Sequence, residues 1–189
     1  MANIFDLSTF RSELPATDKI QRLIWGFVWA TLFRPSPRTA FGFRRFLLRC
    51  FGATIGEGVK VYNSTLIFNP SRLTIGDYSI IGPGAEIYNV ATIGISNNCV
   101  ISQGAYLCSA THDYLSPNFA LIAKPIEISP DVWICARSFI GPGVKVARGA
   151  VIGAMAVVFS DIGEGDIVAG NPAKTIRNRF AFPPDQKTQ

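Results

Sequence analysis

The chain contains a single histidine, His112, within the segment SATHD at 109–113. An imidazole, with a reference pKa of ~6.5, can take a proton from a hydroxyl group as that oxygen attacks a thioester. A lone histidine at an arbitrary position is more often structural than catalytic, so the place of His112 in the fold decides which role we expect. The neighbouring Asp113 is a second candidate, either as a substrate contact or as a solvated turn residue.

The four cysteines show no CxxC spacing, and the first ten residues are mixed and include Asp6, unlike a secretory signal. We therefore expect reduced thiols and a cytoplasmic protein. Three of the cysteines fall on small-residue positions of the repeat described below, so packing accounts for them better than catalysis or a disulfide does. The four are Cys50, Cys99, Cys108 and Cys135.

A six-residue repeat covers most of the chain. Its aliphatic position recurs fifteen times and is always Ile, Leu or Val. The fifteen are Ile55, Val61, Ile67, Ile75, Ile81, Ile87, Ile95, Ile101, Leu107, Ile128, Ile134, Ile140, Val146, Ile152 and Val158. The following residue is often small, as a tight turn requires. One short strand and one turn per hexapeptide predict a triangular coil of eighteen residues, in which equal positions stack between coils to make a dry core.

The repeat divides into five coils of three hexapeptides, and its three interruptions all follow the third hexapeptide of a coil. Two of them add two residues, whereas the third adds a protruding loop, residues 113–127. All three are therefore expected at one corner of the prism, where a solenoid usually builds its binding surface. His112 closes its hexapeptide at the root of the long loop, which favours a catalytic role.

Residues 1–54 are expected to form a helical cap, with helices over 18–33 and 41–51. Neither helix reaches the ~20 apolar residues that a membrane span needs. Two compatible interpretations remain open: the helices cover the first coil, or they form a basic amphipathic anchor in peripheral contact with a membrane. After a β-helix over 55–163, residues 164–189 are expected to form a short C-terminal extension.

The formal net charge of +5 comes entirely from the first fifty residues, which hold eight basic and three acidic groups, whereas the rest carries ten of each. The β-helix itself is therefore neutral overall. Zinc-finger, basic-zipper and RNP-like patterns are also absent from the sequence. We expect no nucleic-acid partner.

The sequence resembles the hexapeptide-repeat acyltransferases, the left-handed β-helix family of galactoside, maltose and serine O-acetyltransferases. It is most similar to colanic acid acetyltransferase-type enzymes of exopolysaccharide synthesis. The stretches that carry the resemblance, besides the repeat, are TLFRPSPR at 31–38, SATHD at 109–113, VWICARSFIGPGVKV at 132–146, VIGAMAVV at 151–158 and IVAGNPAKTIR at 167–177.

This resemblance implies an all-β, left-handed parallel β-helix of about five coils that forms a homotrimer with active sites between subunits. It implies an acetyl-CoA-dependent O-acetyltransferase acting on a sugar or glycan hydroxyl, with His112 as general base in direct transfer. No metal is implied. The implied CoA contacts are the cleft-lining Trp133, the backbones of Ala136 and Ala154 at the pantetheine, and Lys174 and Arg177 at the phosphates. The alternative is that these three residues have no role in CoA binding: Trp133 is then a solvent-side coil residue, and the two cations are ordinary surface charge.

The chain departs from the family pattern in two places. Phe159-Ser160 stands where sugar acetyltransferases often have Thr-Lys after the last repeat, which puts one CoA contact in doubt. The family's acceptor-binding Asn and Asp correspond to Gly82 and Val90, and only Asn89 stands near enough to replace one of them. We therefore expect an acceptor other than a simple galactoside or maltose, with Asn89 and Asp113 as candidate substrate contacts.

Three other interpretations remain open. γ-Class carbonic anhydrases share the fold but hold a metal with three histidines, and one histidine per chain supplies such a site only across a threefold axis. The corner position of His112 disfavours that arrangement. A non-catalytic β-helix that assembles a larger complex predicts no CoA binding. An N-acyltransferase acting on an amino sugar fits the same residues.

Overall fold

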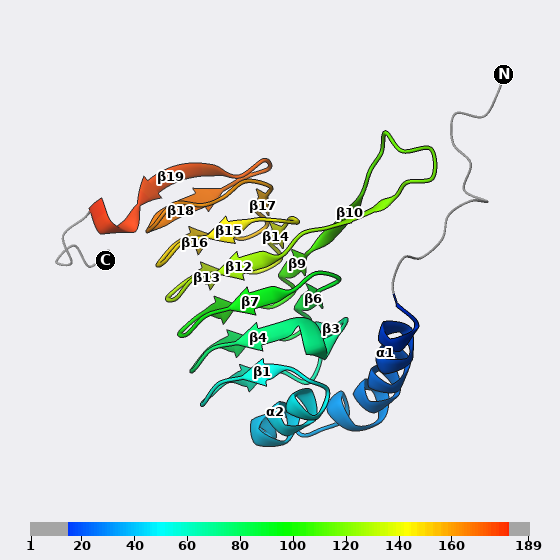
Figure 1. The fold of residues 1–189 in the computed structure, drawn as a ribbon. Coiled ribbons are helices and arrows are strands. Elements are labelled where there is room, and N and C mark those ends of the chain that lie inside the picture. The colour runs from blue at the N-terminus through cyan, green and yellow to red at the C-terminus, as the bar shows by residue number, and fades with distance from the viewer. Residues whose placement is uncertain (1–14, 182–189) are drawn as a thin grey trace.

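The computed structural model describes residues 15–181, which form a three-sided parallel β-helix with two helices at one end (Figure 1). Sheet A contains β1 (Thr54–Ile55), β4 (Leu73–Ile75), β7 (Ile93–Ile95), β12 (Ile126–Ile128) and β15 (Lys145–Val146). Sheet B contains β2 (Lys60–Val61), β5 (Ile80–Ile81), β8 (Val100–Ile101), β13 (Trp133–Ile134), β16 (Val151–Ile152), β18 (Asp166–Ala169) and the antiparallel β19 (Lys174–Asn178). Sheet C contains β3 (Leu66–Ile67), β6 (Glu86–Tyr88), β9 (Tyr106–Cys108), β14 (Phe139–Ile140) and β17 (Val157–Val158).

The core consists of the repeated aliphatic side chains. All fifteen positions of the six-residue repeat are buried, none more than 6% exposed. They stack in register between coils, so that Ile81 of β5 pairs with Val61 of β2 below and Ile101 of β8 above. Fully burying one such side chain contributes about 1.5–3 kcal/mol. The parallel β-helix expected from the repeat is confirmed.

A partial sixth coil extends the β-helix past the five that the repeat predicts. Ile162 bridges to Val146 of sheet A, and β18 pairs in parallel with β16 of sheet B. Val168 fills the next core position and is 1% exposed. Ile162 follows Val158 by only four residues, so the register of the repeat shifts here, and the six-residue step resumes from Ile162 to Val168. β19 then pairs antiparallel with β18 at this end of sheet B.

The N-terminal segment contains α1 (Ala16–Val28), a π-helical turn η2 (Trp29–Phe33) and α2 (Phe41–Cys50). Trp25 and Phe33 are buried against the first coil, together with Leu47 and Leu48 of α2. None of the helices within residues 15–181 is long and apolar enough to cross a membrane.

These helices supply hydrogen-bond donors in place of a preceding coil. The second coil's carbonyls accept from N–H groups of the first coil, but the first coil has no coil before it. Its five equivalent carbonyls accept instead from side chains of the N-terminal segment, at 2.6 to 2.9 Å. The pairs are Arg49 to Ile55, Arg45 to Val59, Arg44 to Val61, Trp29 to Thr65 and Trp25 to Ile67.

Arg44 is the most buried of these donors, with no exposed surface. Besides Val61, it donates to the Ser36 hydroxyl and to the carbonyls of Pro37 and Arg38, at 2.7 to 2.8 Å. Burial lowers the pKa of its guanidinium from the ordinary value. The hydrogen-bond partners of this guanidinium are carbonyl and hydroxyl oxygens, with no carboxylate among them. These oxygens therefore compensate its charge.

Candidate active site

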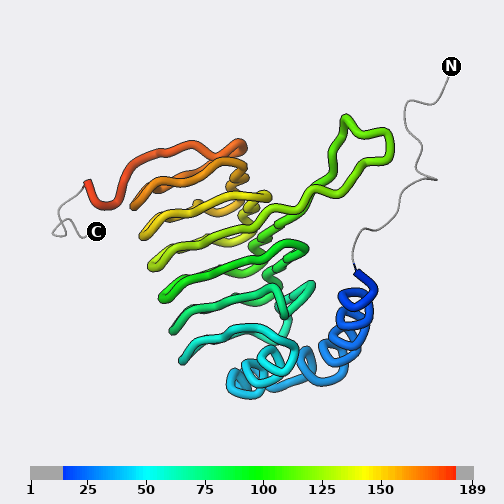
Figure 2. Tube along the Cα trace, viewed as in Figure 1, coloured from blue at the N-terminus to red at the C-terminus, as the bar shows by residue number. Residues whose placement is uncertain are grey.

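All three insertions emerge at the corner between sheets C and A, as the repeat predicts. The first carries the short 3₁₀ helix η3 (Pro70–Arg72) between β3 and β4, and the second lies between β6 and β7. The third lies between β9 and β12 and is an antiparallel hairpin of β10 (Ala110–His112) and β11 (Leu121–Ala123). Figure 2 shows this hairpin projecting away from the prism as an arm. The sequence predicts a loop over 113–127, whereas paired strands form the base of the arm.

His112 is the last residue of β10, opposite Leu121 of β11, and its side chain is exposed. Its Nδ1 lies 2.7 Å from the carbonyl oxygen of Phe119. A carbonyl oxygen only accepts, so in the neutral ring Nδ1 carries the proton. Nε2 is then the ring nitrogen that can take a proton. This is the tautomer that a general base at the arm would use.

Asp113 stabilises the turn of the arm. Its Oδ1 accepts from the N–H of Leu115 at 2.9 Å, and its own N–H donates to the carbonyl of Ala120 at 2.8 Å. This short-range side-chain bond is an Asx-type turn. The structure therefore gives Asp113 a local role in holding the strand that ends at His112.

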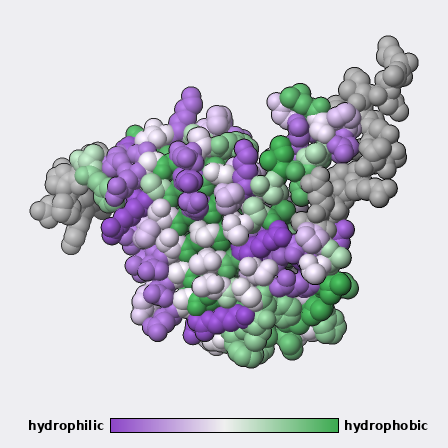
Figure 3. All heavy atoms as spheres, viewed as in Figure 1, coloured by the Kyte–Doolittle hydropathy of each residue, from purple (hydrophilic) through white to green (hydrophobic). Residues whose placement is uncertain are grey.

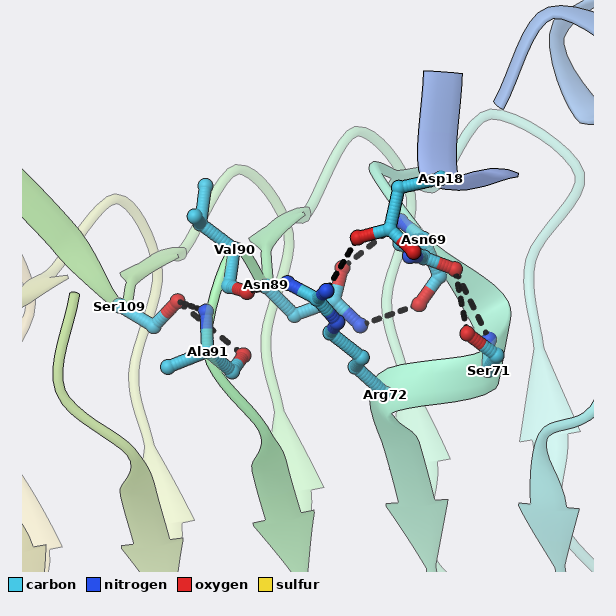
Figure 4. A network of polar contacts seen from close by, with 8 residues as sticks. All are labelled: Asp18, Asn69, Ser71, Arg72, Asn89, Val90, Ala91 and Ser109. Atoms are coloured by element: carbon cyan, nitrogen blue, oxygen red, sulfur yellow. Dashed lines mark hydrogen bonds and ion pairs between the residues drawn. The ribbon is translucent and has the colours of Figure 1, made fainter. Parts of the chain in front are cut away.

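Asn89 lies in a polar ladder along the same corner (Figure 4). It has no exposed surface, and both ends of its amide bond the backbone of Asn69: Oδ1 accepts from N–H at 2.9 Å and Nδ2 donates to the carbonyl at 2.6 Å. One coil further on, the Ser109 hydroxyl accepts from Ala91 N–H at 2.9 Å. Both polar atoms of the Asn89 side chain are therefore engaged inside the corner, and its role as an acceptor contact stays a prediction.

Arg72 ties this ladder to the N-terminal segment. Its guanidinium pairs with Asp18 of α1 and donates to the carbonyl of Val90 (Figure 4). The Asp18 side chain is largely shielded from solvent, with 16% exposed. The first helix and the corner that carries His112 are thus joined by a direct ion pair.

The expected pantetheine contacts lie at a different corner, between sheets B and C. Ala136 follows β13 and Ala154 follows β16, so they occupy equivalent turns of successive coils. The carbonyl of Ala136 accepts from the N–H of Met155 at 2.9 Å. Trp133 of β13 is 50% exposed, and its Nε1 donates to the Ser102 hydroxyl at 3.0 Å. The exposed half of the indole offers an apolar surface, and its Nε1 is held by the hydrogen bond.

The two expected phosphate contacts stand on β19, at the C-terminal end of sheet B. Lys174 pairs with Ala169 of β18 and Arg177 with Ile167, and both cations are exposed. They therefore lie past Ala154 on the same side of the prism. The strand pairing gives these residues a fixed base, although the sequence predicts only an extension there.

An aromatic row covers the outer face of sheet C, between the two corners. Neighbouring rings are 4.6 to 6.5 Å apart between centroids, mostly edge to face. The row consists of Phe68, Tyr88, Tyr106, Phe139 and Phe159. Burial raises the pKa of Tyr106 far above its ordinary value, so this phenol stays neutral. The sequence carries the signal, because each of these residues adjoins the third aliphatic position of its coil, but the repeat count alone does not reveal it.

A groove lies at the helical end of this row. It has a volume of ≈ 640 Å³ and lies between α1 and strands β3 and β6. Apolar and aromatic side chains dominate its lining, including Leu23, Trp29 and Leu66, with Arg22 stacked over the Phe68 ring at 3.6 Å. None of the expected catalytic or CoA-binding residues lines it.

Two of the four cysteines, Cys99 and Cys108, contribute to packing inside the β-helix. All four are free thiols: Cys99 and Cys108 are buried, Cys135 is half-buried and Cys50 is exposed. Burial raises the pKa of the Cys99 and Cys135 thiols, which disfavours the nucleophilic thiolate. Within residues 15–181, His, Cys, Asp and Glu side chains form no group of three or more that could hold a metal ion.

Known proteins with similar sequences are acetyltransferases by name, although no established family profile matches the chain. WcaF of Escherichia coli (strain K12), named as a colanic acid biosynthesis acetyltransferase, is 40% identical over 156 residues, covering 82% of this chain and 86% of that protein. Galactoside O-acetyltransferase of the same strain is 30% identical over 137 residues, covering 71% and 68%.

Solved structures share the architecture over most of the chain. A galactoside acetyltransferase in complex with coenzyme A matches with a TM-score of 0.81 at 26% identity, covering 88% of this chain and 84% of that one. A hexapeptide-repeat acetyltransferase of Vibrio cholerae O1 biovar eltor, complexed with acetyl coenzyme A, matches with a TM-score of 0.80, covering 89% and 92%. At 24% identity, the second match supports the fold alone. The chain belongs to the hexapeptide-repeat acetyltransferase family and is an acyltransferase.

Proposed function

We propose that this protein transfers an acetyl group from acetyl-CoA to a hydroxyl of a sugar or glycan in polysaccharide synthesis. The observation that carries the proposal is the geometry of His112, on the arm at the insertion corner with Nδ1 held by a carbonyl. Similarity to proteins named for colanic acid biosynthesis and for galactoside O-acetylation supports the acceptor class.

In the proposed reaction, Nε2 of His112 takes the proton of the acceptor hydroxyl as its oxygen attacks the thioester carbonyl. The tetrahedral intermediate collapses, the carbon–sulfur bond breaks, and the CoA thiolate leaves with the proton from the imidazolium. The acetyl group passes directly to the acceptor without an acyl-enzyme. The raised pKa of the Cys99 and Cys135 thiols supports a direct route over a cysteine nucleophile.

The donor site in this proposal runs along sheet B toward β19. The exposed face of Trp133 lines the cleft, the turns at Ala136 and Ala154 meet the pantetheine amides, and Lys174 and Arg177 meet the phosphates. Small residues in equivalent turns leave room for a linear chain, and cations on a paired strand suit phosphate groups. Phe159, in place of the usual Thr, presents a 65% exposed ring beside this path.

We propose that the active enzyme is a homotrimer in which each site is shared by two chains. The turns at Ala136 and Ala154 stand at the corner between sheets B and C, while His112 stands at the corner between sheets C and A. The width of one prism face separates these corners in a single chain. Direct transfer needs reacting atoms about 3–3.5 Å apart. A neighbouring prism that places its donor corner against the arm would meet this requirement.

Reduced thiols and the acetyl-CoA donor both suit a cytoplasmic enzyme.

Titration calorimetry with acetyl-CoA tests the donor, followed by a screen of nucleotide-sugar, lipid-linked and oligosaccharide acceptors by CoA release. We expect saturable acetyl-CoA binding and O-acetylation of at least one glycan. Absence of CoA binding by the folded protein would favour a non-catalytic β-helix. A product acetylated on nitrogen, with an amino sugar in the screen, would replace the O-acetyl assignment with N-acyl transfer.

Mixing two inactive variants tests the shared site. His112→Ala removes the base, and Ala154→Trp places a large ring in the pantetheine path. Refolding an equal mixture should restore about a quarter of the sites, because each restored site takes His112 from one variant and the donor corner from the other. Continued inactivity of well-formed mixed trimers would contradict a site shared between chains.

A further inference from the structure

The outer face of the N-terminal helices is apolar, although their inner face already covers the first coil. In α1, the side chains of Ile20, Leu23, Ile24 and Phe27 follow the spacing of a single helical stripe and are 51–76% exposed. Leu32, Phe43 and Phe46 are also exposed, by 43–60%. Figure 3 shows the hydrophobic surface gathered over this end of the molecule. These seven residues are called the outer patch below.

The helices that carry the outer patch hold mostly positive charge, although the exposed Glu86 of β6 lines the same groove as Leu23. Exposed cations occur at the start of α1, after η2 and at the end of α2; they are Lys19, Arg34, Arg38 and Arg49. The only acidic residue between positions 15 and 54 is Asp18, and it is paired with Arg72. An apolar centre with a basic rim matches the chemistry of an anionic lipid surface, in which phosphates lie above acyl chains.

We propose that the outer patch seats the protein on the surface of an anionic bilayer. The stripe of α1 would enter the boundary between headgroups and acyl chains, while the rim cations contact lipid phosphates. A second copy of this chain is a poorer occupant in a symmetric pairing of patches, because it would bring two rims of the same sign together. The inference does not depend on the proposed acetyl transfer, since no donor or catalytic residue belongs to the patch.

Vesicle flotation with the full-length protein tests this inference. One set of vesicles contains phosphatidylcholine alone, and the other contains equal parts of phosphatidylcholine and phosphatidylglycerol. We expect the protein to float with the anionic vesicles and to be released as salt is raised. The double variant Leu23→Gln/Phe27→Gln should partition about tenfold less, because it removes two large apolar side chains from the contact.

Tyr78→Asn is the matched control. Tyr78 is 63% exposed on the β-helix, outside the patch, and its φ of 59° suits asparagine. This variant should bind vesicles as the native chain does, and circular dichroism and acetyl-CoA titration should match for all three proteins. Equal binding by the double variant, or no binding by the native chain, would overturn the inference. Dissociation of the oligomer by the double variant, without vesicle binding by the native chain, would identify the patch as a subunit interface.

Discussion

In the body of the β-helix each coil repeats the one before it, whereas the three insertions at the corner between sheets C and A differ in conformation. Ile81 sits between Val61 and Ile101 in the same way along the whole stack. At the corner, successive coils carry a two-residue insertion with a 3₁₀ turn, a second two-residue insertion without one, and a projecting hairpin. The body is apolar and the corner is a ladder of polar side chains.

This difference separates stability from chemistry. The stacked residues gain free energy from burial and need only the right size and period. The corner needs individual hydrogen bonds, because its buried polar groups are costly when left unpaired. His112 lies on the arm, outside both the stacked core and the polar corner. Its side chain can therefore be exposed without disturbing the packing of the stacked residues.

The largest loss of stability is expected from the centre of the stack. Ile101→Ala removes a side chain with no exposed surface between two neighbouring coils. The free energy of unfolding should fall by about 2–5 kcal/mol, measured by urea denaturation. Turnover per folded molecule should stay near that of the native protein. An unchanged free energy of unfolding for Ile101→Ala would contradict the conclusion that the stacked aliphatic side chains stabilise the core.

Loss of the buried guanidinium at the helical end should have the next largest effect. Arg44→Met leaves the carbonyl of Val61 and three further oxygens without their donor, at a cost of about 3 kcal/mol. Arg45→Met removes one bond from a half-buried site and should cost about 1 kcal/mol. Equal effects of the two substitutions in urea denaturation would show that Arg44 is not the central donor.

Asn89→Ala distinguishes a structural corner residue from a substrate contact. It removes both hydrogen bonds to the Asn69 backbone and should lower the free energy of unfolding by about 2 kcal/mol. The KM for the acceptor should be unchanged at temperatures where the variant is folded. A raised acceptor KM with native stability would support a direct contact between Asn89 and the acceptor.

The smallest effect concerns the thiols. Cys50 is exposed, whereas burial shields Cys99 and raises its pKa. The thiolate fraction of Cys99 is therefore reduced at neutral pH and increases only as the pH rises toward this raised pKa. Iodoacetamide should modify Cys50 first, with little change in acetyl transfer, as followed by mass spectrometry and CoA release. Complete inactivation by labelling at Cys50 alone would contradict this order.

The sequence predicts the periodic part of the molecule well, because one environment repeated in every coil leaves a countable pattern. All fifteen stacked positions and the shared corner of the insertions follow from it. The hydrogen bonds of Arg44 and its neighbours could not be predicted, since they depend on how the helices lie against first-coil carbonyls. The partial sixth coil was missed for another reason: Ile162 follows Val158 by four residues, and the six-residue step resumes only from Ile162 to Val168.

The candidate site divides in the same way. His112 could be placed at the insertion corner by counting, but its tautomer depends on the carbonyl of Phe119, seven residues away across the arm. Asn89 was expected at an acceptor site because of its type and position, whereas its burial depends on Asn69 one coil below. Side-chain direction at an irregular corner is set by such contacts, which no sequence period encodes.

The most direct test of the account is the rate of acetyl transfer by His112→Ala, measured by CoA release at saturating acetyl-CoA, with Thr111→Ala as a control on the same strand. The account predicts a decrease in kcat of about a hundredfold or more for His112→Ala. It also predicts unchanged acetyl-CoA affinity and thermal stability for this variant, and near-native turnover for the control. Turnover by His112→Ala equal to that of the native protein would contradict the assignment of His112 as general base.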